Sequence, residues 1–186
     1  PLHHTYPFMV TVIVPLFYGA TITFVPQDFN PKNLSKTIKE SGVTVITGVP
    51  QLFFLIHNTI SESLRKIPLI LRAVFSPILK LYLRNIFASN LRFMISGGAR
   101  LETKICRNML KWGFKIIEGY GLTEASPVVT FNSPGRVKFG SVGKPLPDVK
   151  VRIDNPDKNG IGEVLIQGPN VMKGYFKHPE ETALAL

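Results

Sequence analysis

Short apolar runs alternate with amphipathic stretches along the first two-thirds of the chain. Each run is brief and bounded by turn-forming residues, which favours a buried strand over a helix. The runs cover residues 21–25, 43–47, 91–96 and 114–118. The intervals between them are long enough to hold helices, so the pattern predicts strands that alternate with helices.

Helix signals occupy those intervals. Asn30 is a favourable cap before a helix in which Leu34 and Ile38 lie four residues apart on one face. Further helices are predicted from Pro50 and over residues 101–112. A strand–helix–strand order at these lengths implies parallel pairing with right-handed crossovers.

Glycine-rich segments follow two of the predicted strands, one after Ser96 and one after Glu118. In parallel sheets, ligands bind beyond the carboxyl ends of the strands. We therefore expect both segments to lie at one ligand-binding edge.

The last third of the chain changes character. Residues 149–153 and 162–167 alternate as strands do, and a turn-forming cluster at residues 155–160 separates them. Residues 171–176 are a candidate third strand. These patterns are typical of antiparallel pairing.

The predicted fold class is therefore α/β, with two subdomains. A parallel-rich α/β sheet subdomain covers residues 1–135 and is followed by a small antiparallel β subdomain over residues 136–186, with the boundary near residues 133–138.

Composition narrows the classes of protein. The chain has 186 residues, 45% of them hydrophobic, which is ample for a packed core and excludes a disordered chain. A single cysteine, Cys106, excludes an internal disulfide and a cysteine-based zinc cluster, and a reduced, cytoplasmic setting is the simplest interpretation. No run reaches the roughly 18 apolar residues of a membrane-spanning helix, and residues 1–7 lack a signal-peptide pattern.

The formal net charge of +10 attracts anions, among them nucleotides, CoA phosphates, acidic lipids and nucleic acids. The chain has neither the interleaved aromatic and basic pattern of an RNA-binding module nor helix-turn-helix spacing. Nucleic acid is therefore not an expected partner.

Residues 61–92 are both basic and apolar, with Glu62 as their one acidic residue, and Pro68 and Pro77 should break them into short helices. One interpretation is a peripheral contact with a membrane surface. The other is a helical insert packed on the core, with its basic side chains reaching water. The second is favoured because no clean amphipathic period runs through the prolines.

The most informative segment is residues 118–127, EGYGLTEASP. Glycines around Tyr120 let the backbone approach a ligand, and its ring offers a flat face to a purine. Thr123 offers a hydroxyl to a phosphate oxygen, and Glu124 offers a carboxylate to a magnesium ion. From the residues alone, a purely structural turn is the alternative interpretation.

This segment closely resembles the adenine and phosphate motif of the acyl-adenylate-forming superfamily, and further motifs of that family follow its expected order. These are residues 1–6 (PLHHTY), 96–99 (SGGA), 162–168 (GEVLIQG) and 174–176 (GYF). The motifs HHTYPF and GYGLTEASPVV are most similar to those of medium- to long-chain fatty acyl-CoA synthetases. Peptide-synthetase domains usually have proline where this chain has Leu122.

The resemblance implies roles for particular residues. Thr123 would hold the α-phosphate, Glu124 would hold Mg²⁺, and His4 would lie between the acyl pocket and the phosphate as the third catalytic residue. The nucleotide-binding set would be Gly98, Ala99, Glu118, Gly119, Tyr120, Gly121 and Thr123. Many relatives have glutamine or aspartate in place of Glu118, and we expect glutamate to be tolerated because it can also accept a hydrogen bond from the adenine amino group.

The resemblance also implies the reaction: ATP and a fatty acid give an acyl-adenylate, which CoA converts to acyl-CoA. The family's phosphate loop, ribose-binding aspartate and mobile lid are expected outside this chain, so the chain alone should have little turnover. Alternatives are a fatty acyl-AMP ligase, an aryl-CoA ligase, or a non-catalytic nucleotide- or lipid-binding module. Chain-length preference and oligomeric state, a homodimer included, are left open.

Overall fold

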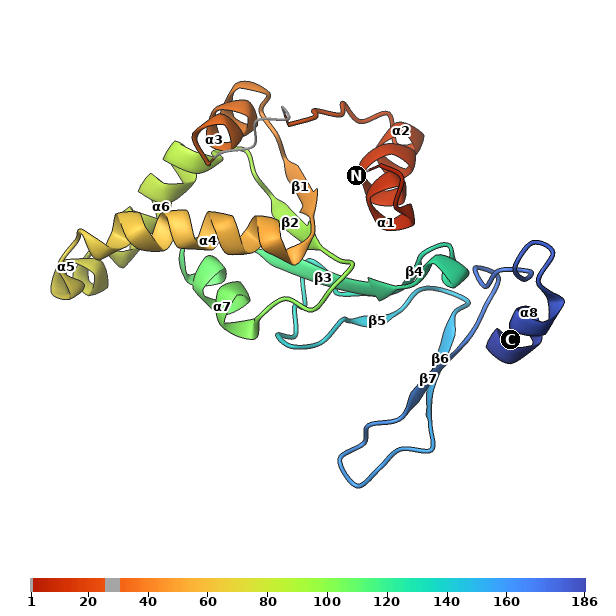
Figure 1. The fold of residues 1–186 in the computed structure, drawn as a ribbon. Helices are drawn as coiled ribbons and strands as arrows, with labels where there is room; N and C mark the ends of the chain where they lie inside the picture. Colours follow the sequence, from red (N-terminus) through yellow and green to blue (C-terminus); the bar gives the residue numbers. More distant parts are fainter. Residues whose placement is uncertain (1, 26–30) are drawn as a thin grey trace.

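The computed structural model describes residues 2–25 and 31–186, without the side chains of residues 31, 32, 69, 73 and 74. Its centre is a five-stranded sheet of order β1-β2-β3-β4-β5 (Figure 1). A separate two-stranded sheet, β6-β7, forms a hairpin that projects away from the centre. The mixed α/β fold class is confirmed.

The first three strands are parallel, as the sequence predicts. They are β1 (Val45–Gly48), β2 (Phe93–Ser96) and β3 (Ile116–Gly121). Ser96 pairs with Glu118 in the register, so the glycines that follow both residues reach the same edge of the sheet.

Helices pack against these strands and build the main core. They are α3 (Pro31–Glu40), α4 (Pro50–Arg65) and α7 (Thr103–Lys111). The predicted inward-facing residues Leu34, Ile38, Ile105 and Met109 are all buried, as are Phe53 and Met94. Asn30, the predicted cap of α3, lies outside the described residues.

The second half of the sheet is antiparallel and was not predicted. Strand β4 (Val128–Phe131) returns alongside β3, and β5 (Lys144–Pro145) pairs with β4. The Gly-Tyr-Gly segment is therefore part of β3 and not a turn. The subdomain boundary near residues 133–138 stays a prediction.

Two predicted strands are wrong. Residues 21–25 have no regular secondary structure, and the Phe24 and Val25 side chains are exposed. The run has the composition of a strand, but no described strand lies beside it to supply hydrogen bonds. Residues 171–176 take part in no strand, and only an isolated bridge joins Tyr175 to His178. The Met172 and Tyr175 amides donate instead to the Glu124 carbonyl and the Thr182 hydroxyl.

The hairpin strands β6 (Lys150–Asp154) and β7 (Glu163–Gln167) agree closely with the prediction. The chain then ends in α8 (Pro179–Ala185). An unpredicted helical run begins the chain and comprises α1 (Thr5–Phe8), a π-helical turn η1 (Met9–Ile13) and α2 (Val14–Phe17).

The basic and apolar insert forms the short helices α5 (Leu69–Val74) and α6 (Ser76–Phe87). Pro68 directly precedes α5 and Pro77 lies in the first turn of α6, so the prolines break the segment as expected. Leu83 and Phe87 are buried, and the Arg84 guanidinium donates to the carbonyls of Gly113 (3.2 Å) and Leu91 (2.8 Å). The insert therefore packs on the core.

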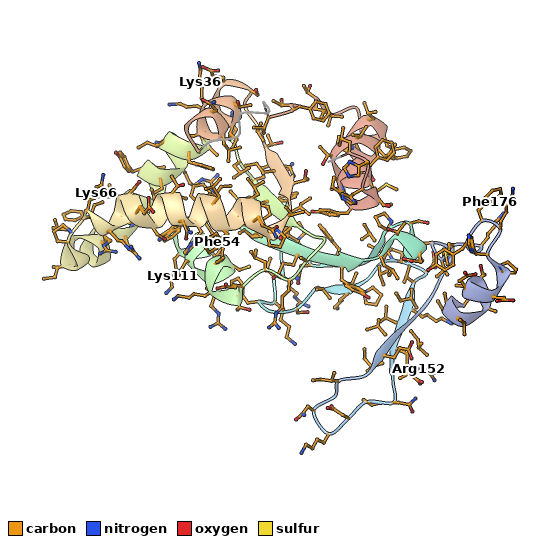
Figure 2. All side chains as sticks on the ribbon, in the orientation of Figure 1. Lys36, Phe54, Lys66, Lys111, Arg152 and Phe176 are labelled. Carbon is orange, nitrogen blue, oxygen red and sulfur yellow. The ribbon has the colours of Figure 1, made fainter. Side chains whose placement is uncertain are left out.

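The outer side of α6 exposes apolar side chains, among them Ile78 and Leu81. Lys66, which belongs to this insert, lies at the opposite end of the molecule from Phe176 (Figure 2). Across the described residues, no helix is both long and apolar enough to cross a membrane.

Candidate functional site

A pocket of about 390 Å³ opens at the carboxyl ends of β2 and β3. Segments that are distant in the sequence meet around it. They are the start of the helical run (4–7 and 10), the residues after β1 and β2 (Val49, Gly97 and Gly98), the end of β3 with the turn that follows (119–123), and β4 with its preceding proline (127, 128 and 131). The expected ligand-binding edge of the sheet is therefore hollowed.

Tyr6 fixes the helical run to this edge. Its hydroxyl donates to the carbonyls of Gly48 and Ile95, each at 3.3 Å, and burial raises the pKa of Tyr6, so the phenol stays a proton donor. Its ring lies so close to Gly97 that a Cβ there would come within 2.5 Å of the ring. These contacts bring the exposed imidazole of His4 to the pocket.

The end of β3 shapes the pocket beneath Tyr120. The register with β4 shifts between Tyr120 and Gly121, and the Leu122 amide donates to the Pro127 carbonyl at 2.9 Å. A Cβ on Gly121 would overlap that same carbonyl, so only glycine fits. Tyr120 is consequently held half-buried in the pocket wall.

The 3-10 turn η2 (Thr123–Ala125) carries the two predicted phosphate and metal residues. The turn ends at Ser126, whose backbone is left-handed (φ 57°), an unfavourable conformation for a residue other than glycine. The exposed Thr123 hydroxyl faces the pocket and accepts a hydrogen bond from Thr5 at 3.4 Å. Thr123 therefore lies where the helical run meets the turn.

Glu124 lies beside the pocket and does not line it. Its Oε1 accepts a hydrogen bond of 2.8 Å from the Tyr175 hydroxyl. Its own backbone N–H and then Tyr175 lower the pKa of the carboxyl, so Glu124 is charged at neutral pH.

The surroundings of Glu124 fit a magnesium ion bound with a nucleotide. Magnesium in such sites is held by one or two carboxylates, while phosphates and water complete its shell. The residues described form no group of three or more His, Cys, Asp or Glu side chains that could hold a metal alone. Glu124 would therefore contribute the protein's carboxylate, as the sequence predicts.

Glu118 is buried and does not line the pocket. The Cys106 thiol donates to its Oε2 at 3.7 Å. Burial raises the pKa of the Glu118 carboxyl, while the contacts with Cys106, the Leu101 amide and Arg100 oppose that rise. Burial and the Glu118 charge together raise the pKa of Cys106 to about 12.

The structure thus brings most of the predicted site residues together around one pocket, and they are His4, Gly98, Gly119, Tyr120, Gly121 and Thr123. It does not place Ala99, Glu118 or Glu124 in the lining. The sequence did not indicate the contacts made by Tyr6 and Tyr175, although both residues lie in recognised motifs.

Residues 1–176 match the family model described as AMP-binding enzyme. The chain belongs to this family. The resemblance to the acyl-adenylate-forming superfamily is thereby confirmed, and the pocket at the edge of the sheet is the candidate site of an AMP-binding enzyme.

Two curated relatives are similar over the whole chain. The long-chain-fatty-acid–CoA ligase of Bacillus subtilis (strain 168) is 30% identical, with 100% of this chain and 31% of that protein covered. The feruloyl-CoA synthase of an Amycolatopsis species is 29% identical, with 100% and 35% covered. The chain therefore spans about a third of the length of these relatives.

A solved structure of a malonyl-CoA ligase in a ternary product complex with methylmalonyl-CoA and AMP has the same fold. It is 26% identical, with a TM-score of 0.76, and the alignment covers 100% of this chain and 37% of that one. The relatives are CoA ligases whose names give different acids, so family membership alone does not select a substrate.

Proposed function

We propose that this chain is the adenylate-binding centre of an AMP-forming ligase that converts a medium- or long-chain fatty acid into acyl-CoA. The observation that supports this best is the pocket that joins His4, Tyr120 and Thr123, which come from different elements. The similarity to a fatty-acid–CoA ligase over the full chain agrees with it.

Each side chain has a task in the proposed reaction. The Tyr120 ring would stack against adenine, and the glycines beside it would let the nucleotide approach the backbone. The Thr123 hydroxyl would donate to an α-phosphate oxygen, and His4 would face the incoming carboxylate. Glu118 lies behind the pocket wall, and its proposed role is to accept a hydrogen bond from the adenine amino group near the end of β3.

The proposed reaction has two steps, and in each step one bond forms as another breaks. A carboxylate oxygen attacks the α-phosphorus of ATP and pyrophosphate leaves, giving the acyl-adenylate. The CoA sulfur then attacks the acyl carbon, AMP leaves, and the thiol proton passes to solvent. Because two anions meet in the first step, hydrogen-bond donors and positive charge are needed there. A magnesium ion, when bound, would supply that charge, and Glu124 would hold it.

An aryl-CoA ligase is a second candidate, and one observation favours it. The feruloyl-CoA synthase is as similar to this chain as the fatty-acid enzyme is, at 29% against 30% identity. Both candidates use the same adenylate chemistry and differ only in the acid.

ATP–pyrophosphate exchange on the longest polypeptide that carries this chain tests the proposal. A panel of fatty, aryl and dicarboxylic acids, each with CoA present and omitted, separates a fatty acyl-CoA ligase from an aryl-CoA ligase and from a fatty acyl-AMP ligase. We expect the fastest exchange with fatty acids, and acyl-CoA only when CoA is added. No exchange with any acid would favour a non-catalytic binding module.

Glu124→Gln tests the metal role in the same assay. The substitution removes the charge but keeps the shape, so exchange should fall about 100-fold or more if the carboxylate holds the cation. Glu62→Gln on α4, an exposed carboxylate far from the pocket, is the matched control and should have no effect. Unchanged exchange in Glu124→Gln would refute the metal role.

The proposal includes three broader expectations. The isolated 186-residue chain should show little turnover because it spans only about a third of its relatives.

A cytoplasmic location is expected, and residues 61–92 would supply any contact with an anionic membrane. Sedimentation with vesicles that contain or lack anionic lipid tests that contact, and absence of pelleting in both would refute it.

A further inference from the structure

A loop from the end of the chain lies directly against the turn that carries Thr123 and Glu124. The Met172 amide donates to the Glu124 carbonyl at 2.7 Å. The Asn170 side-chain amide donates to the carbonyls of Ala125 (3.0 Å) and Val128 (3.1 Å). The residues that follow β7 therefore fix the backbone of the η2 turn and of β4 just after it.

Tyr175 extends this attachment to a side chain of the site. Its hydroxyl reaches Glu124 Oε1 at 2.8 Å, across 51 positions of sequence. A phenol that donates to a carboxylate forms a charge-assisted hydrogen bond, which is stronger than one between neutral groups. The bond fixes one oxygen of the carboxylate and so restricts the rotation of the whole group.

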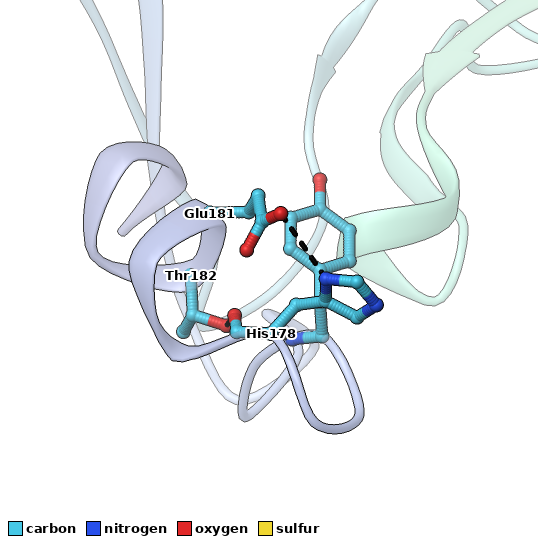
Figure 3. Close-up of polar contacts among 4 residues, drawn as sticks. His178, Glu181 and Thr182 are labelled. Atoms are coloured by element: carbon cyan, nitrogen blue, oxygen red, sulfur yellow. Dashed lines mark hydrogen bonds and ion pairs between the residues drawn. The ribbon is translucent and has the colours of Figure 1, made fainter.

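Tyr175 is itself held in place by the first turn of α8. Its backbone amide donates to Thr182 Oγ1 at 2.9 Å, and that hydroxyl donates to the His178 carbonyl at 2.7 Å. In the same turn, the Glu181 carboxylate approaches the His178 imidazole at 3.1 Å (Figure 3). A short, internally bonded unit therefore positions the tyrosine.

We propose that Tyr175 is a positioning residue that orients the Glu124 carboxylate for the nucleotide-bound cation. This role for Tyr175 rests on the proposed function in one respect, namely that Glu124 is the cation ligand. The tyrosine does not line the pocket, and it acts only through Glu124. Correct placement of α8 is thereby coupled to the geometry of the metal site.

Tyr175→Phe removes only the hydroxyl and leaves the ring, so it separates orientation from packing. Loss of one such hydrogen bond should weaken cation binding about threefold to tenfold. The first readout is the dissociation constant of the Mn²⁺ complex of α,β-methylene-ATP, measured by calorimetry on the longest polypeptide that carries the chain. The second is the Mg²⁺ concentration that gives half-maximal ATP–pyrophosphate exchange.

Tyr82→Phe is the matched control. Tyr82 lies on α6, is 58% exposed, and undergoes the same chemical change far from the site. We expect it to leave both readouts unchanged. Circular dichroism melting of both variants checks that neither substitution unfolds the protein.

A double-mutant cycle with Glu124→Gln completes the test. Because Tyr175 acts through the charged carboxylate, Tyr175→Phe should change little once Glu124 is glutamine. If Tyr175→Phe alone leaves Mn²⁺ affinity within twofold of the parent while Glu124→Gln weakens it, the positioning role is wrong. An equal loss in both backgrounds would also overturn it. If Glu124→Gln itself has no effect, the metal role in the proposed function is what fails.

Discussion

The sheet region and the hairpin region are stabilised in different ways. Around β1–β3, the side chains of Phe53, Met94 and Met109 are fully buried within one large apolar cluster. In the β6–β7 hairpin, by contrast, Ile153, Val164 and Leu165 are each about two-fifths exposed, at 43%, 39% and 37%. The hairpin therefore has no comparable core of its own.

The hairpin and the loop after it depend instead on polar contacts with the sheet region. A small cluster forms where Val149 packs near Ala125 and Val129. Beyond it, Asn170, Met172 and Tyr175 bond to the turn around Glu124. One region is stabilised by burial and the other by hydrogen bonds to the candidate site, so changes in the second region should affect the site more than the fold.

The largest effect that would test this comparison is in the core. Met94→Ala on β2 should lower the free energy of unfolding by about 2–5 kcal/mol, because it opens a cavity at a fully buried position. Val164→Ala on the half-exposed β7 should cost less than about 1 kcal/mol. Urea unfolding followed by fluorescence of the single tryptophan, Trp112, measures both. Equal costs would mean that the hairpin has a core that its exposure does not reveal.

A smaller effect is expected from the polar contacts. Asn170→Ala removes two hydrogen bonds to the Ala125 and Val128 carbonyls and should loosen the loop by about 1–2 kcal/mol. Hydrogen exchange at the Met172 amide, which is bonded to the Glu124 carbonyl, should then be roughly tenfold faster or more. Asn159→Ala, at the exposed tip of the hairpin, is the control and should leave that amide protected.

The same division explains which elements the sequence could predict. The helices α4 and α7 and the strands β2 and β3 have their own apolar periods and clear stops, such as Gly113 with φ 93°. Strand β5 has two residues, one of them Pro145, and therefore has no local pattern to detect. Residues 21–25 have the opposite problem, because their composition is strand-like but no strand among the described residues pairs with them.

The candidate site shows this limit at the level of side chains. Residues 118–127 form a contiguous motif, so the nucleotide-binding roles of Tyr120 and Thr123 could be predicted from neighbouring residues in the sequence. The hydroxyl of Tyr6 meets a carbonyl 89 positions away, and that of Tyr175 meets a carboxylate 51 positions away. Such contacts depend on the folded arrangement of the sheet and cannot be read from local patterns.

The smallest effect concerns the buried carboxyl behind the pocket. Burial raises the pKa of Glu118 in the folded protein, so the neutral carboxyl persists to a higher pH there than in the unfolded chain. Its contribution to stability is complete below the unfolded value of about 4.3 and is lost as the pH rises through the folded pKa. Glu118→Gln cannot ionise, so the unfolding free energy of this variant relative to the parent should increase as the pH is raised from 4 to 7.

Thermal unfolding of the parent and the variant across that pH range measures the difference. Glu62→Gln, the same substitution at an exposed position on α4, is the matched control. A constant difference for Glu118→Gln would mean that the hydrogen bonds from Cys106 and the Leu101 amide fully offset the cost of burial. In that case the pKa of Glu118 would be the same in the folded and the unfolded protein, and burial of this carboxyl behind the pocket would not make stability depend on pH.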